Sequence, residues 1–493
     1  MAQQTLVQPL PFAAGEFPGC GGTLKSVCAH FCVTEIPEPS TPLTDGKHCH
    51  ITLTREGCTT REMQNKLARL FSVRPDDIGA AGLKDRHARV TQTFSLPREN
   101  MPKEFRAAGE GEGSGLHAIV ARLRGAEAEE SWQLCVDPPP AWHRGKLRRG
   151  AIVGNAFEII VSDTEVPVDE ALRRARAISD ALRQVGGWPN YYGIQRFGHG
   201  HSNAFRGRAL FYDRLKLPLP ALAEASGSGG AAEAAEPAEP PRKKVKRRAP
   251  WLEALTLGAF QSALFNLCVA ERLQRGLFST LLCGDLVGFP RGTTKPRLVK
   301  VPSAALPTEG GGAAAAAAAA EGSPAPAAWP TAVQAAVPTA EPAEPAPAPA
   351  ATPSSAATQW GDAVDWSVAP SAEDAEAFAA GTITFTAPMF GADLATPRGV
   401  AVEIEDAVWA EHAPGVAISR LKPSLLMGTR RAARLPLPAD LAIEACDEAA
   451  GLRFAFSLPS GAYATSLLRE FMRNDAADAG GGGGGGGDEA EAE

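Results

Sequence analysis

Three low-complexity stretches interrupt this chain of 493 residues and limit which parts of it can fold. Residues 223–249 are rich in Ala, Glu, Gly and Pro, and residues 303–358 contain an eight-alanine run followed by PAEPAPAPA. A glycine run with an acidic end lies within 475–493. Such compositions bury too little apolar surface to build a packed core. The sequence therefore predicts a compact chain with two disordered internal linkers and a disordered Gly-rich acidic tail.

The net charge of −7 is concentrated in the same stretches. The tail carries −6, residues 303–358 carry −4 and residues 221–250 carry +2, which leaves +1 for everything else. The acidic balance therefore does not argue against a nucleic-acid partner for the folded part. No apolar run approaches the roughly 20 residues of a membrane span, so we expect no membrane partner.

Between these stretches, helical and strand-like patterns are mixed along the chain. A capping box at Thr59–Glu62 predicts a helix that continues through Phe71. Further helices are predicted over 169–185, stopped by Gly186-Gly187, and from about 259 to 274; strands are predicted at 31–33, 157–161 and 454–458. The elements lack the regular alternation of a doubly wound sheet, which favours an α+β class.

Two short clusters of Cys and His raise the possibility of a metal site. Cys28, His30 and Cys32 would share one face of a strand, and residues 48–50 read His-Cys-His. Structural zinc sites usually contain CxxC pairs, and none is present here. We therefore expect ordinary reduced thiols and no metal, although the pattern alone does not decide this.

The densest group of chemically useful residues is the segment GLKDRHARVTQ, residues 82–92. Asp85 lies between Lys84 and Arg86, and neighbouring cations keep a carboxylate ionised and available as a nucleophile or base. The alternative is a turn aspartate between solvated basic residues. The segment alone leaves both interpretations open.

A basic stripe leads into one of the predicted strands. Four cations precede a Gly-Asn-Ala-Phe run, a pattern suited to contact with phosphates by the cations and contact with a base by the residues that follow. A solvated loop before a core strand fits equally well. The residues concerned are Arg144, Lys146, Arg148, Arg149, Asn155 and Phe157.

Two further segments carry aromatic residues that suit either recognition of a base or packing. PNYYGIQRFG, residues 189–198, could form a recognition loop or pack beneath a domain joint. Tyr463 follows a Pro/Gly turn, where it could stack on a base or be a buried ring with a bonded hydroxyl.

Taken together and in this order, these blocks resemble the TruD family of pseudouridine synthases. The blocks are GLKDRHARVTQ, HRGKLRRGAIVGNAF, PNYYGIQRFG, FQSALFNLCVAERL and LPSGAYATSLLRE, and the resemblance runs from about residue 22 to residue 473. One position departs from the family pattern, because His30 stands where an acidic residue usually precedes the first-strand phenylalanine.

The resemblance implies an α+β catalytic domain with the pseudouridine synthase fold, interrupted by a family-specific α+β domain. The catalytic domain would comprise 1–186 and 436–474, and the insertion, which contains both linkers, would comprise 187–435.

The same resemblance assigns roles within the site. Asp85 would be the catalytic aspartate, and Lys25 the lysine that contacts or positions it. Asn155 and Phe157 would lie at the active site with Phe157 stacking on the target base, and Tyr463 would line the same pocket. The reaction would need no cofactor.

The resemblance points to tRNA as substrate, with a D-arm uridine at position thirteen as the family's usual target and mRNA or small nuclear RNA as further targets of some members. A catalytically silent RNA-binding protein on the same fold is the rival hypothesis. PRKKVKRR, residues 241–248, predicts nuclear import, or an additional arm for RNA phosphates. A monomer is the default expectation.

Overall fold

The structure is a computed structural model that describes residues 6–7, 9–107, 111–127, 132–135, 137–220, 250–290, 297–299 and 369–474. The predicted linkers 223–249 and 303–358, the basic run 241–248 and the tail 475–493 lie outside these residues. The described part mixes helices with three sheets, which confirms the α+β class.

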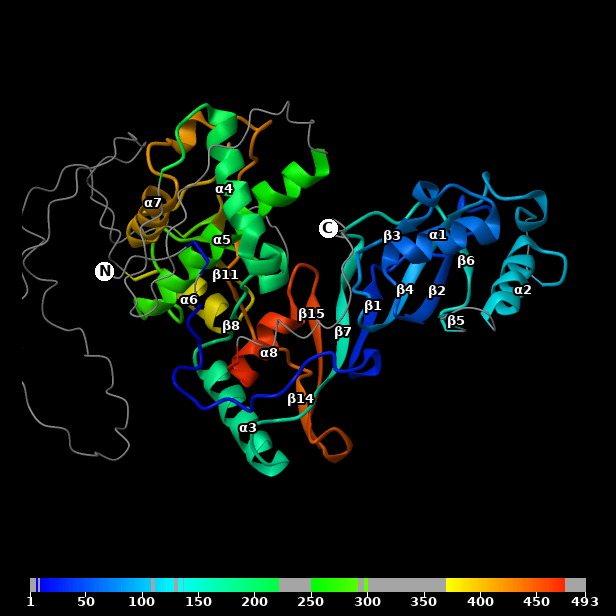
Figure 1. The fold of residues 1–493 in the computed structure, drawn as a ribbon, viewed down its shortest axis with the longest axis horizontal. Coiled ribbons are helices and arrows are strands. Elements are labelled where there is room, and N and C mark those ends of the chain that lie inside the picture. Colours follow the sequence, from blue (N-terminus) through cyan, green and yellow to red (C-terminus); the bar gives the residue numbers. More distant parts are fainter. Residues whose placement is uncertain are drawn as a thin grey trace, which may run out of the picture.

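The largest sheet has nine strands and combines residues from both ends of the chain (Figure 1). Its main order is β14-β15-β7-β1-β4-β2-β5, with β3 paired to β4 and β6 paired to β2. Strands β1 and β4 are parallel, and the other described pairs in this sheet are antiparallel. The bounds are β1 (Phe31–Pro37), β2 (His48–Glu56), β3 (Gly79–Ala80), β4 (Arg89–Pro97), β5 (Trp132–Leu134), β6 (Ala141–His143), β7 (Ile152–Val161), β14 (Ala442–Cys446) and β15 (Gly451–Pro459).

Amphipathic helices cover this sheet and form two hydrophobic cores with it. Strand β15 alternates, so Leu452, Phe454, Phe456 and Leu458 are buried on one face. They belong to one core with α3 (Val168–Gln184) and α8 (Ala464–Met472). Helices α1 (Thr60–Phe71) and α2 (Gly115–Glu127) form a second core with β2 and β4.

Two helices of the large sheet match their sequence predictions closely. Helix α1 begins after Thr59, whose hydroxyl accepts from the Glu62 backbone while the Glu62 carboxylate accepts from the Thr59 backbone. Both halves of the predicted capping box are therefore present. Helix α3 ends at Gln184, and Gly186 follows with φ of 82°, a left-handed value that suits glycine.

A separate body of helices and a smaller sheet lies beside the large sheet (Figure 1). Helices α4, α5 and α7 pack together with β11 around a third core rich in aromatic rings. The small sheet has the order β10-β9-β11-β12. The bounds are α4 (Ser202–Leu215), α5 (Pro250–Gln274), α6 (Ala372–Ala379), α7 (Val400–His412), β9 (Leu286–Gly288), β10 (Arg297–Leu298), β11 (Thr384–Met389) and β12 (Thr429–Ala432).

Helix α5 is the central helix of this body. It begins at Pro250, nine residues before the predicted start, because proline is well suited to the first turn of a helix. Within the described residues, its Leu252–Gln274 stretch is long and apolar enough to cross a membrane by length and composition. Its most apolar window is 78% buried inside the protein, so internal packing accounts for this hydrophobicity.

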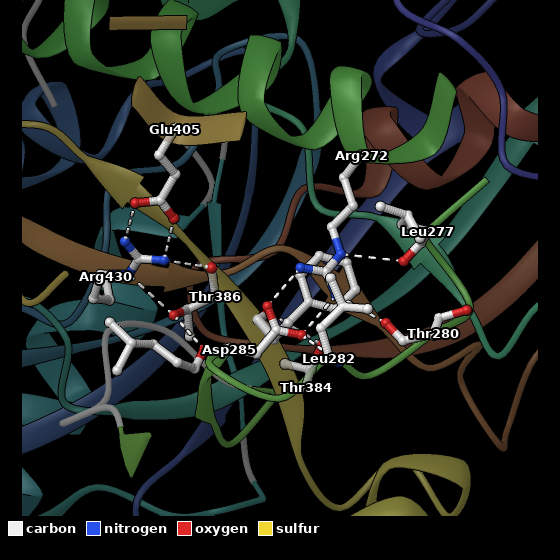
Figure 2. Close-up of polar contacts among 11 residues, drawn as sticks. Arg272, Leu277, Thr280, Leu282, Asp285, Thr384, Thr386, Glu405 and Arg430 are labelled. Carbon is white, nitrogen blue, oxygen red and sulfur yellow. Dashed lines mark hydrogen bonds and ion pairs between the residues drawn. The ribbon is translucent and has the colours of Figure 1, made fainter. Parts of the chain in front are cut away.

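Two buried ion pairs lie in the same body, on either side of β11 (Figure 2). The Arg430 guanidinium donates to both carboxylate oxygens of Glu405, at 2.6 and 2.8 Å. Arg272 donates to both oxygens of Asp285, at 2.6 and 2.7 Å. Burial raises the pKa of Glu405, and the adjacent Arg430 opposes that effect. These bidentate pairs compensate charges that would be costly to bury alone.

The chain enters and leaves this body through one short ladder. Strand β8 (Trp188–Pro189) pairs with β13 (Arg434–Leu435). At Gly187 the φ is 137° and a Cβ would lie 2.0 Å from the Leu435 carbonyl oxygen, so this close approach requires glycine. The ladder lies at the bounds predicted for the insertion, and the division into 1–186, 187–435 and 436–474 remains a prediction.

The first described residues are attached to the last helix. The Ala13 amide donates to Glu470 Oε2 at 3.1 Å, and the Arg469 guanidinium donates to the Leu10 carbonyl. Glu470 is completely buried, and burial raises the pKa of its carboxyl to about 7. The N-terminal segment is thus fixed to α8 through backbone groups.

Candidate active site

The segment between β3 and β4 carries Asp85 between two bends, at 81–82 and at 86–88, and its side chains alternate in exposure. Leu83, Asp85 and His87 are exposed, whereas Lys84 and Arg86 are partly buried. The two cations are anchored to different elements: Lys84 pairs with the buried Glu35 on β1, and Arg86 pairs with Glu62 in the first turn of α1. This anchoring presents the carboxylate of Asp85 to solvent.

Lys25 is the partner of Asp85, as the family resemblance implied. Lys25 Nζ lies 2.6 Å from Asp85 Oδ2, and the lysine side chain is 8% exposed against 52% for the aspartate. Lys25 has a left-handed backbone with φ of 58°, an unfavourable conformation that persists only when the surroundings impose it. Here the Thr23 amide donates to Ser162 O, and the hydroxyls of Ser26 and Ser162 lie 2.5 Å apart. The lysine is therefore held from the end of β7.

A buried polar network lies beneath the Asp85 segment, and the sequence did not predict it. Glu35 on β1 accepts from Gln92 Nε2 at 2.9 Å and from the Thr93 amide at 3.2 Å. The same Gln92 amide donates to the Gly82 carbonyl at 2.8 Å, and Lys84 Nζ lies 3.3 Å from Glu35. Burial lowers the pKa of Lys84, while Glu35 opposes that effect. The network fixes the backbone three residues before Asp85.

Arg55 and Thr60 complete this network from the other side. The Lys84 amide donates to Thr60 Oγ1 at 2.9 Å, so the backbone next to Asp85 is also fixed. The Arg55 guanidinium donates to Thr60 Oγ1 and to Gln92 Oε1, both at 3.2 Å. Arg55 is 1% exposed, and burial lowers its pKa. The backbone on the N-terminal side of Asp85 is thus attached at Gly82 and at Lys84 to side chains of the sheet and of α1.

Asn155 contacts the neighbour of Asp85 and not the carboxylate itself. Its Oδ1 accepts from Lys84 Nζ at 2.5 Å. Asn155 on β7 stands directly opposite Glu35 on β1, and Lys84 therefore contacts both. Asn155 thus contacts the Asp85 segment through the Lys84 side chain.

Phe157 belongs to a row of three aromatic rings that ends beneath Lys25. Its ring stacks on Phe456, with centroids 5.5 Å apart, and meets the edge of Phe31 at 6.3 Å. Lys25 Nζ lies 4.6 Å from the centroid of Phe31. Phe157 is half-buried, and Phe31 connects its ring to Lys25 of the Lys25–Asp85 pair.

Tyr463 lies at the junction between the large sheet and the helical body. It is the residue before α8, and its ring centroid is 5.7 Å from that of Tyr192. The Arg431 guanidinium lies 4.0 Å from the Tyr192 centroid and 5.4 Å from that of Tyr463. The structure therefore places Tyr463 in packing contact with the 187–435 segment.

The PNYYGIQRFG segment packs beneath the same joint. Asn190, Tyr191 and Phe197 are 2–3% exposed, and Arg431 donates to Asn190 Oδ1 at 2.6 Å. Of the two interpretations left open by the sequence, packing is confirmed for these three residues.

The basic stripe forms an exposed loop beside the Asp85 segment. Arg144, Lys146, Arg148 and Arg149 are all exposed, and the Gly150 amide donates to the Ala81 carbonyl at 2.8 Å. Lys146 donates to the carbonyl of Asp76. Three of these cations line a groove with Leu83, and Arg144 is not among its lining residues.

Cys28, His30 and Cys32 do not lie together on one strand, whereas the strand predicted at 31–33 is present as part of β1. Residues Cys28–His30 form a 3-10 helix, η1, and β1 begins only at Phe31. Strand β4 separates β1 from β2, which carries His48–His50. The two clusters therefore do not converge, and no group of three potential metal-ligating side chains occurs in the described part of the chain.

Comparisons with known proteins agree on one family. The family described as tRNA pseudouridine synthase D (TruD) matches residues 12–216 and 361–471. A protein of that name from Anaeromyxobacter dehalogenans strain 2CP-C is 30% identical over 469 residues, covering 95% of this chain and 97% of its own length. Another from Thermus thermophilus is 28% identical over 468 residues, covering 95% and 93%.

A solved structure has the same fold. A crystal structure from Methanosarcina mazei, provisionally assigned as tRNA pseudouridine synthase D, superposes with a TM-score of 0.59 at 18% identity. It covers 97% of this chain and 98% of its own. From the family match and the relatives together, the chain belongs to the TruD family of pseudouridine synthases.

Proposed function

We propose that this chain converts uridine to pseudouridine in tRNA, with Asp85 as the catalytic residue. The observation that carries the proposal is the Lys25–Asp85 pair, in which a buried ammonium holds a half-exposed carboxylate at 2.6 Å. Lys25 holds the carboxylate in place, and the exposed part of the Asp85 side chain is accessible to a substrate. Family membership supplies the reaction type, and relatives named tRNA pseudouridine synthase D supply the substrate class.

The reaction is an isomerisation in which the atoms balance within the substrate. The bond between C1′ and N1 breaks, a bond between C1′ and C5 forms, and the hydrogen on C5 is replaced by one on N1. The uridine must leave its stack before C5 can face the ribose. Asp85 would assist by attacking the sugar carbon or by removing a sugar proton, and both routes use the same carboxylate.

Aromatic side chains would hold the displaced base. Phe157 lies on the row of rings that ends beneath Lys25, which makes it suited to stacking on the base. Stacking of this kind is worth about 1–3 kcal/mol per base. Tyr463 is proposed for the same pocket, from its position at the joint. Lys146, Arg148 and Arg149 would contact phosphates near the groove, and Arg144 a phosphate further along the loop.

Pseudouridine mapping of total tRNA incubated with the purified protein tests the proposal. Wild type should form pseudouridine at defined positions, and Asp85→Asn should form none. Asp180→Asn is a matched control, because Asp180 is also an exposed carboxylate paired with a cation, Arg183 at 3.2 Å. It should behave as wild type. If wild type and Asp85→Asn modify no RNA but both bind tRNA, the silent RNA-binding hypothesis is favoured.

The particular RNA, the oligomeric state and the compartment remain proposals. Repeating the mapping on mRNA and small nuclear RNA tests the wider targets, and light scattering tests the expected monomer. Nuclear import by residues 241–248 is tested by fusing 223–250 to a fluorescent cargo. A diffuse cytoplasmic signal would contradict it.

A further inference from the structure

Leu83 is an exposed apolar side chain on the same side of the chain as Asp85. Leu83 and Asp85 are two residues apart and both exposed, while Lys84 between them is turned inward to Glu35 and Asn155. Two residues of extended chain span no more than about 7 Å, so Leu83 lies within that distance of the catalytic position. Leu83 is 40% exposed, and its open part makes no contribution to the core.

A groove of about 420 Å³ opens beside Leu83. Its lining includes Gly79 and Ala80 of β3 together with Gly82. A Cβ added at Gly82 would be in ordinary van der Waals contact, at 3.7 Å, with Glu35 Oε1 and Lys84 Nζ of the buried network. Residues with little or no side chain in the lining allow a flat ring to approach the backbone beside Leu83. A volume of this size suits a small planar ligand.

The rim of the groove is positively charged. Arg61, Lys146, Arg148 and Arg149 line it, together with one carboxylate, Asp76. Asp76 is paired with Arg61 at 2.8 Å, and the remaining cations have no other carboxylate among the lining residues. A lining that combines the apolar Leu83 and small residues with four cations is complementary to a base joined to phosphates.

We propose that this groove is the binding site for a nucleotide adjacent to the target uridine, with its base against Leu83 and its phosphate at the Arg/Lys rim. The proposal rests on the function proposed above and adds a second position of RNA contact. When the target uridine leaves its stack, its neighbour loses a stacking partner. The Leu83 side chain takes the place of that partner.

A coupling experiment tests the contact with Leu83→Ala and a synthetic RNA hairpin that carries a tRNA D-arm sequence. Two further hairpins each lack the base on one side of the target uridine. One of these two abasic hairpins should bind wild type about 3- to 10-fold more weakly than the complete hairpin, the range expected for a partly buried apolar contact. Leu83→Ala should weaken binding of the complete hairpin by a similar factor and should no longer distinguish it from that abasic hairpin.

The control is Leu217→Ala, since Leu217 is also a 40% exposed leucine but follows α4 in the other body. It should match wild type with every hairpin. Each combination of protein and hairpin is measured both as Kd and as kcat/KM. If the Kd values show the coupling between Leu83 and the base but no hairpin is converted, the result counts against the proposed function and not against the groove. If, for both abasic hairpins, the fold-change in Kd caused by base removal is the same in Leu83→Ala as in wild type, the two perturbations are independent and the proposal is overturned. The absence of measurable hairpin binding by wild type at low salt would also overturn it.

Discussion

Replacing Glu35 by glutamine should damage both stability and catalysis, because Glu35 supports the Asp85 segment from a buried position. Its side chain is 2% exposed, and Lys84, 3.3 Å away, is 8% exposed. Glu35→Gln removes the negative charge that compensates the buried Lys84 ammonium, and the Asn155 amide oxygen that also accepts from Lys84 is neutral. Breaking a buried ion pair from one side costs about 3–5 kcal/mol. At about 2–4 °C per kcal/mol for a folding unit of 150–250 residues, Tm should fall by about 6–20 °C.

The catalytic effect follows from the hydrogen bonds that Glu35 shares with Gln92. Glutamine at position 35 has one acceptor oxygen where Glu35 uses two, so it cannot accept from both Gln92 and the Thr93 amide, and the backbone that Gln92 holds at Gly82 loosens. A misplacement of about 1 Å at a reacting group costs on the order of 100-fold in rate. Single-turnover pseudouridine formation should therefore slow by up to about that factor, with little change in RNA affinity.

The matched control is Glu62→Gln, which removes a carboxylate paired with the other cation of the segment. The Arg86–Glu62 pair is 2.6 Å long but its side chains are 42% and 37% exposed. Exposed pairs contribute about 0–1 kcal/mol, and glutamine still serves in the capping box of α1. Thermal unfolding should show a shift of no more than about 4 °C. Equal losses in Glu35→Gln and Glu62→Gln would refute the argument that burial gives the network its importance.

Three other predictions concern separate parts of the molecule. Glu405→Leu should cost about 3–5 kcal/mol of stability, whereas Glu405→Leu with Arg430→Met should be close to neutral; additive losses in thermal unfolding would contradict this. Because burial raises the pKa of Glu470 from 4.5 to about 7, the native state holds a proton that the unfolded state releases, so stability should fall as pH rises from about 4.5 to 7 and level off above. Glu470→Gln should remove that slope, and an unchanged pH profile would count against it. Lys146→Ala with Arg148→Ala should reduce the slope of log Kd against log salt by about 1.4–1.8, and an unchanged slope would remove both residues from the RNA interface.

Local patterns predicted much of the secondary structure, because their causes are local. The Thr59 capping box, the stripe of α3 with its glycine stop and the alternation in β15 each depend on residues a few positions apart. The strand predicted at 31–33 is likewise present in β1, and the alternation of Cys28, His30 and Cys32 does not extend it backward because residues Cys28–His30 form η1.

The site could be predicted only in part. The motif around Asp85 did not identify Lys25, which lies 60 residues away; the family resemblance did. Glu35 and Gln92 were missed, since their contact joins β1 to β4 across 57 residues. The sequence nevertheless contains a pattern that could have identified both residues. Each stands on the buried face of a strand among apolar neighbours, and a polar side chain there needs a partner.

The pairing of β15 with β7 has a consequence for biosynthesis. Leu452 lies opposite Val161, so 291 residues separate the two strands along the chain. At roughly 5–20 residues per second, about 15–60 s pass between the synthesis of β7 and that of its neighbour. Throughout that time the nascent chain carries an open sheet edge with unpaired amide and carbonyl groups. A silent codon change that slows elongation between the two strands should therefore lower the yield of folded protein while leaving the stability of the finished molecule unchanged.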